Sequence, residues 1–148
     1  STYHATYSGG GDNALADGVL GSETSYNDGH WQGYWGENID VEYDFGEAKN
    51  INKITTRFLQ NTFNWILAPT TIHLYTSTEN NEWELVKTAH FNPDFRRGEV
   101  HVHTNTITDL DITTQRLRIV VENPGKLPSW HPAPNQPSYL FIDEIVIE

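Results

Sequence analysis

The stretch Asn38-Ile39-Asp40-Val41-Glu42-Tyr43-Asp44-Phe45 decides the fold, because every odd position is apolar and every even position is polar. Successive side chains of a β-strand point to opposite faces, so this alternation predicts a strand with one buried and one solvated face. Gly46 is expected to end the strand. The residues predicted to point into the core are Ile39, Val41, Tyr43 and Phe45.

The same period of two recurs along the chain, and no helical period lasts for three turns. Only 13–19 could form a short helical turn. Further strands are predicted over 51–59 (with Ile54, Thr56 and Phe58 on one side), 71–77, 83–90, 99–104, 116–121 and 139–147. Seven or eight short strands separated by turn residues predict an all-β protein, built as an antiparallel β-sandwich.

Composition limits the classes of partner. The 148 residues fit a single domain, 1–148, which we expect to be a monomer. A net charge of −11 disfavours nucleic acid and anionic membranes as partners, and no apolar run approaches the ~20 residues needed to span a bilayer. The chain has no Cys, which excludes thiol catalysis and disulfides; it also has no Met, which suggests a module cut from a longer chain.

Three stretches interrupt the strand pattern, and all are rich in aromatic residues: 22–36, 61–69 and 123–137. An aromatic ring can cover the flat C–H face of a sugar, while amides and imidazoles bond its hydroxyls. The predicted stacking residues are Trp35, Trp65 and Trp130, and the predicted hydroxyl partners are Gln32, Asn64 and His131. The alternative is that these rings plug the ends of a small sandwich.

Other chemistry has weaker support. His101 and His103 stand two apart on a strand, so they could share a metal, but no third ligand is identifiable and a solvated strand face is the better interpretation. Most acidic residues alternate with apolar ones, and no G-x-S-x-G motif is present, so an independent enzyme is not expected.

Several motifs in order resemble the discoidin, or coagulation-factor C-type, domain, and among these the family 32 carbohydrate-binding modules. They are Asn13-Ala14-Leu15-Ala16-Asp17-Gly18 with Ser22, Trp31-Gln32-Gly33-Tyr34, the strand ending at Gly46, Phe58-Leu59-Gln60, Trp65, 125–131, and Phe141-Ile142-Asp143-Glu144-Ile145. The resemblance implies a jelly-roll sandwich of the galactose-binding-domain type, with Trp31 in the core.

The resemblance also implies a structural calcium ion that joins the two ends of the domain. Calcium prefers six to eight oxygen ligands and accepts carbonyls readily. Val19 stands where the family often has Asn or Asp, so one side-chain ligand is missing. The implied side-chain ligands are Asp17, Ser22 and Glu144, and the implied carbonyl ligands are Ala14, Val19, Ser22 and Asp143.

The function implied is a non-catalytic module that tethers a parent enzyme to glycans with galactose- or N-acetylhexosamine-type sugars. Its partners would be the glycan and the covalently linked catalytic domain of a chitobiase-like β-N-acetylhexosaminidase. The location implied is bacterial: secreted, periplasmic or cell-surface. The alternative is a structural appendage whose aromatic residues pack on the catalytic domain and bind no sugar.

Overall fold

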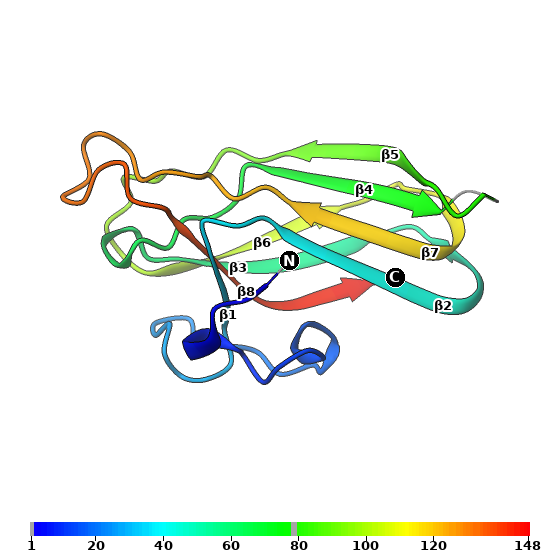
Figure 1. The fold of residues 1–148 in the computed structure, drawn as a ribbon, viewed down its shortest axis with the longest axis horizontal. Helices are drawn as coiled ribbons and strands as arrows, with labels where there is room; N and C mark the ends of the chain where they lie inside the picture. Colours follow the sequence, from blue (N-terminus) through cyan, green and yellow to red (C-terminus); the bar gives the residue numbers. More distant parts are fainter. Residues whose placement is uncertain (1, 78–79) are drawn as a thin grey trace.

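The computed structural model describes residues 2–77 and 80–148, which form a β-sandwich (Figure 1). The described residues contain eight strands: β1 Gln32–Trp35, β2 Ile39–Ile51, β3 Ile54–Gln60, β4 Thr71–Ser77, β5 Trp83–His90, β6 His101–Ile107, β7 Ile112–Val121 and β8 Tyr139–Ile147. They also contain three 3₁₀ turns: η1 Ala5–Tyr7, η2 Ala14–Ala16 and η3 Thr62–Asn64. The predicted all-β fold class is confirmed.

The strands pair into two antiparallel sheets. Sheet A has the order β1-β8-β3-β6, and sheet B has the order β2-β7-β4-β5. Figure 1 shows sheet B in front of sheet A. Because the last strand, β8, lies between β1 and β3, sheet A joins the beginning, middle and end of the chain.

The predicted register of β2 is confirmed. Ile39 is fully buried, while Val41, Tyr43 and Phe45 are partly buried and pack against the same core. Their partial exposure follows from the position of β2 at the edge of sheet B, where it pairs with β7 alone. The opposite sheet supplies the other side of this core through Ile54, Thr56 and Phe58 of β3, as predicted.

Other strand boundaries differ from the prediction. Gly46 does not end β2: it takes a positive φ of 77° within an irregularity between Asp44 and Lys49, after which pairing with β7 resumes. Such a bulge admits extra residues without ending the strand, and glycine accommodates its backbone. β1 was missed because its four residues lie inside the aromatic stretch 22–36. β6 extends to Ile107 and β7 starts at Ile112, so both are longer than expected.

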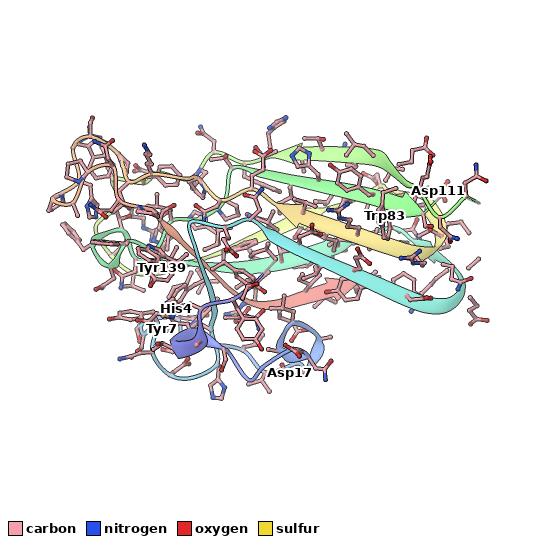
Figure 2. All side chains as sticks on the ribbon, viewed as in Figure 1. His4, Tyr7, Asp17, Trp83, Asp111 and Tyr139 are labelled. Carbon is pink, nitrogen blue, oxygen red and sulfur yellow. The ribbon has the colours of Figure 1, made fainter. Side chains whose placement is uncertain are left out.

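A second cluster covers the outer face of sheet A. Trp31, Leu59, Ile66 and Phe141 are buried there, and Tyr7 and Tyr26 from the N-terminal segment pack against them. Figure 2 shows Tyr7 close to His4 and Tyr139, and the ring centroids of Tyr7 and Tyr139 are 5.7 Å apart. The N-terminal segment is therefore part of the fold, and Trp31 is a core residue, as the family resemblance implied.

Among the described residues, no helix has the length and apolar character required to cross a membrane.

Candidate functional site

Four connections meet at one end of the sandwich, because the strands that enter and leave them are antiparallel. They are residues 36–38, 61–70, 91–100 and 122–138, which together we call the loop end. In Figure 1 the loop end lies at the left, where the orange 122–138 connection projects beyond the sheets. All three aromatic stretches of the sequence contribute to it.

Asn123 fixes the longest connection. Its side-chain amide faces the carbonyls of Tyr34, Glu37 and Ser138 at 3.4, 3.1 and 3.1 Å. Its Oδ1 accepts bonds from the Gly125 N–H and the Ser138 hydroxyl, both at 2.8 Å. One neutral side chain therefore bonds to backbone groups of β1, of the 36–38 connection and of both ends of the 122–138 connection, and it holds the start and the end of this loop together.

The 61–66 turn is fastened to the two neighbouring loops. The Thr62 hydroxyl donates to the Phe95 carbonyl at 2.8 Å, and the Thr62 carbonyl lies 2.7 Å from Nε2 of His131. Gln60, fully buried, donates to the Asp94 carbonyl at 2.7 Å. Hydrogen bonds therefore hold three connections that are far apart in sequence, 61–70, 91–100 and 122–138, together as one surface.

Exposed aromatic side chains stand on this surface. Trp35, Phe63 and Trp130 are 44%, 65% and 39% exposed, and each belongs to a different connection or to the strand end that precedes it. The Arg96 guanidinium lies 4.6 Å from the centre of the Trp130 ring, so one face of that ring is covered. Trp35 stacks on Tyr139 at 5.9 Å and donates its indole N–H to the Pro137 carbonyl.

Trp65 has an unusual backbone. It ends the η3 turn in the left-handed region, with φ of 69°, which few residues other than glycine and asparagine adopt cheaply. Its side chain is half-buried, and Asn64 beside it is exposed. A tryptophan at such a position indicates that its side chain contributes enough to offset the backbone cost.

Two of the predicted hydroxyl partners are buried elsewhere. Gln32 is 3% exposed, donates to the carbonyls of Ser8 and Gly11, and accepts the Tyr34 hydroxyl. His131 is 4% exposed, and both of its ring nitrogens bond to backbone groups. Both side chains support loops and are not available to a surface ligand. Phe63 is the surface residue missing from the prediction; its place in the aromatic stretch 61–69 was the available signal.

The molecule also has hollows away from the loop end. One of about 360 Å³ opens between β1 and β2, where Tyr3, Tyr34 and Tyr43 line it together with Asp12 and Glu42. Its volume would admit a monosaccharide, so it is a competing location for a ligand. Trp35, Trp65 and Trp130 do not line this hollow.

A different constellation surrounds the predicted calcium ligands. Thr56 pairs with Ile145 while Phe58 pairs with Ile142, so two residues of β8, Asp143 and Glu144, stand opposite Arg57 alone. This bulge lets both successive carboxylates reach the 14–22 loop. Glu144 accepts the Gly18 N–H at 2.7 Å, and Asp143 accepts the Gly21 N–H at 2.9 Å.

Electrostatics make these carboxylates costly to ionise. Burial raises the pKa of Asp143, and the Gly21 N–H and Arg57 offset this only in part. Burial also raises the pKa of Glu144, and the nearby carboxylates of Asp17 and Asp143 raise it further. Asp143 Oδ1 is buried without a hydrogen-bond partner among the described residues. A cation beside Glu144 would relieve its repulsion by the neighbouring carboxylates.

The remaining predicted ligands are less well placed. The Ser22 hydroxyl accepts the N–H groups of Thr24 and Ser25, and the Ser22 carbonyl accepts the Trp31 indole N–H at 2.9 Å. Val19 is exposed and supplies no side-chain oxygen. The described residues contain no group of three or more His, Cys, Asp or Glu side chains arranged for a metal, so carbonyls would have to complete the shell.

The chain is similar to a known protein family and to several solved structures. Residues 1–142 match the family model of the F5/8 type C domain. No curated protein sequence matches the chain significantly. Among solved structures, the fold is similar to the family 32 carbohydrate-binding module of AlyQ, solved in complex with 4,5-unsaturated mannuronic acid (14% identity, 99% of this chain and 92% of that one, TM-score 0.57).

Two further solved structures have a fold similar to that of this chain. One is a family 32 module from Clostridium perfringens in complex with GalNAc-β-1,3-galactose (14% identity, 99% of this chain and 90% of that one, TM-score 0.58). The other is the C-terminal domain of a chitobiase from Bacteroides fragilis (14% identity, 100% and 88%, TM-score 0.54). At this identity the likenesses establish the fold, and the family model establishes the relationship. The chain belongs to the F5/8 type C, or discoidin, domain family.

Proposed function

We propose that this chain is a non-catalytic carbohydrate-binding module that binds sugar at the loop end. The observation that carries the proposal is the exposure of Trp35, Phe63 and Trp130 on neighbouring connections. Hydrogen bonds between these connections hold their backbones in place. Rings held in place lose little conformational freedom on binding, which favours stacking on a sugar face. Of the three predicted hydroxyl partners, Asn64 is the exposed one, and it would serve without Gln32 and His131.

Two structural neighbours support this choice, since the AlyQ module and the Clostridium perfringens module were each solved with a sugar. Galactose-type and N-acetylhexosamine sugars are the first ligands to test. A shallow surface that holds one sugar makes few contacts, so the binding free energy should be about −4 to −6 kcal/mol, corresponding to millimolar to tens of micromolar affinity. The parent protein would be a secreted or cell-surface bacterial glycoside hydrolase of the chitobiase type.

We also propose that calcium binds between the 14–22 loop and β8. The raised pKa of Glu144 and its proximity to Asp17 fit a hard cation. Asp17 and Glu144 would supply carboxylates, and backbone carbonyls would supply the rest. The ion would act as a structural cross-link and take no part in sugar chemistry.

The experiment is titration of the protein with galactose and N-acetylgalactosamine, followed by amide chemical shifts. Trp130→Ala and Phe63→Ala should each weaken binding at least fivefold, and Trp65→Ala should abolish it while the fold remains intact. Trp83→Ala is a matched control, because Trp83 lies on β5 at the opposite end of the sandwich (Figure 2) and also carries an arginine, Arg116, 4.9 Å from its ring.

Each result has a defined meaning. If Tyr3→Ala abolishes binding while Trp130→Ala does not, the site is the hollow between β1 and β2. If a broad panel of sugars shifts no resonance of the loop end, the sugar-binding proposal is wrong and the exposed rings serve as a domain interface. If Trp65→Ala unfolds the protein, Trp65 is a core plug, and the other two variants still decide the site.

A further inference from the structure

A pair of histidines on β6 lies outside everything proposed so far. His101 and His103 share a strand face with Ile107, which belongs to the buried core, and His103 pairs across the ladder with buried Phe58. The two imidazoles are therefore half-buried on the inward side of sheet A, and the expectation of a solvated strand face is wrong. β6 is the last strand of its sheet, so the pair stands at an open edge.

The hydrogen bonds of the pair define which nitrogens hold protons. Nδ1 of His101 lies 3.0 Å from the Glu99 carbonyl, which can only accept, so Nδ1 must carry the proton. In the neutral ring, Nε2 of His101 then presents a lone pair. That lone pair points at Nε2 of His103, 2.7 Å away, which must be the donor.

This is the arrangement that supports a metal-binding histidine: one ring nitrogen donates to a carbonyl, and the other is left with its lone pair fixed in direction. We infer that His101 and His103 bind a divalent transition-metal ion such as Zn²⁺ or Ni²⁺ through their two Nε2 atoms, with water in the other positions. Imidazole nitrogen suits these ions and does not suit calcium, so the site is independent of the calcium proposal and of sugar binding.

The change needed to admit the ion is small. His103 moves its proton from Nε2 to Nδ1 through solvent, the hydrogen bond between the two Nε2 atoms is replaced by two metal–nitrogen bonds, and no other covalent bond changes. With metal–nitrogen distances of about 2.0–2.1 Å, the two Nε2 atoms would separate from 2.7 Å to roughly 3–3.4 Å, which side-chain rotation can supply.

The surroundings favour neutral rings, which metal binding requires. Burial lowers the pKa of His103, and the charges of His101 and Arg97 lower it further. In the part of the chain that the structure describes, no third His, Cys, Asp or Glu completes a cluster, so the ion would keep open positions. A two-ligand site of this kind should bind more weakly than a structural zinc site and exchange its metal readily.

The test is a zinc titration of the full chain in excess calcium, followed by the imidazole C–H resonances and by calorimetry. In the wild type, the resonances of both His101 and His103 should shift together with one equivalent of zinc. His101→Gln and His103→Gln should each weaken that binding at least tenfold, because a chelate needs both rings. His90→Gln, an exposed histidine on β5, should leave it unchanged.

The inference is overturned if zinc shifts other histidines first, or if either single variant binds zinc as tightly as the wild type. The wild-type resonances keep the test decisive even if a variant folds poorly. Sugar titrations are unaffected by either outcome, so failure here leaves the proposed function standing.

Discussion

The 14–22 loop and the loop end are both irregular, yet different chemistry holds each of them. The 14–22 loop is attached to β8 by two carboxylates, Asp143 and Glu144, which accept backbone N–H groups. The loop end is held chiefly by groups that do not ionise, the Asn123 amide and the Thr62 hydroxyl. Charged anchors respond to pH and cations, whereas amide anchors respond to neither. The Asn123 and Thr62 side chains beneath the proposed sugar site therefore do not titrate.

The largest expected effect on the free energy of unfolding comes from removing the Asn123 side chain, which holds the loop end together. Asn123→Ala should lower the free energy of unfolding by about 2–4 kcal/mol, because it removes all the hydrogen bonds of this side chain at once and leaves the Gly125 N–H without its acceptor. Urea unfolding followed by tryptophan fluorescence measures this loss. Asn64→Ala, an exposed amide at the same end, should change it by less than about 0.5 kcal/mol. Equal effects of the two variants would mean that the Asn123 network contributes little.

Calcium should stabilise the attachment of the 14–22 loop to Asp143 and Glu144 of β8. With calcium at about a hundred times its dissociation constant, linkage adds roughly 2.7 kcal/mol to the free energy of unfolding. Adding a chelator should therefore lower the melting temperature, and Glu144→Ala should remove that sensitivity. Glu47→Ala, exposed on β2, should retain it. Identical melting curves of the wild type with and without chelator would contradict the proposed site.

The smallest effect is a dependence on pH in the presence of chelator. Because the pKa values of Asp143 and Glu144 are raised in the folded protein, the folded state binds more protons than the unfolded state above their ordinary values. The stability that these groups contribute is present at low pH and is lost as pH rises through their folded pKa values. In a His103→Gln background, which removes the opposing contribution of the buried imidazole with its lowered pKa, the melting temperature should fall by a few degrees between pH 4.5 and 7.

Glu144→Gln should make the melting temperature depend less on pH between pH 4.5 and 7. The range from pH 4.5 to 7 lies above the pH at which Asp40 and Asp44 affect stability. The pKa of Asp40 is lowered by Arg118, and that of Asp44 is lowered by the Gly46 N–H. Those two carboxyls add stability with rising pH only below their ordinary values, near 3.8. A melting temperature that rises from pH 4.5 to 7 would show that the bulge carboxylates are not the dominant titrating groups.

Regular alternation made most of the sandwich predictable. β4, β5 and β8 have the predicted bounds, and β2 has the predicted inward face. The failures occur where the local pattern stops being informative. β1 is recognisable only through its pairing with β8, and the irregularity at Gly46 depends on β7 resuming its pairing beyond it. Both depend on partners that lie far away along the chain.

The candidate site was less predictable, because exposure is decided by the third dimension. Trp35 and Trp130 are exposed as sugar stacking requires, whereas Gln32 and His131 are buried by hydrogen bonds to distant backbone groups. A polar residue beside a tryptophan can support a loop or face a ligand, and the sequence pattern is identical in both cases. The strand spacing of His101 and His103 indicated that they share a face, but it could not indicate that this face points toward the core.

The central position of β8 has a consequence for synthesis. Gln32 pairs with Ile142 and Ile54 pairs with Ile147, so sheet A cannot close until the last strand has left the ribosome. Until then β1 and β3 lack the strand that joins them, and apolar residues such as Phe58 and Leu59 have no partner from β8. Pairing across such sequence separations is slow, and the nascent chain exposes unpaired strand edges meanwhile. We expect this domain to depend on chaperones during translation more than a sandwich whose final strand lies at an edge.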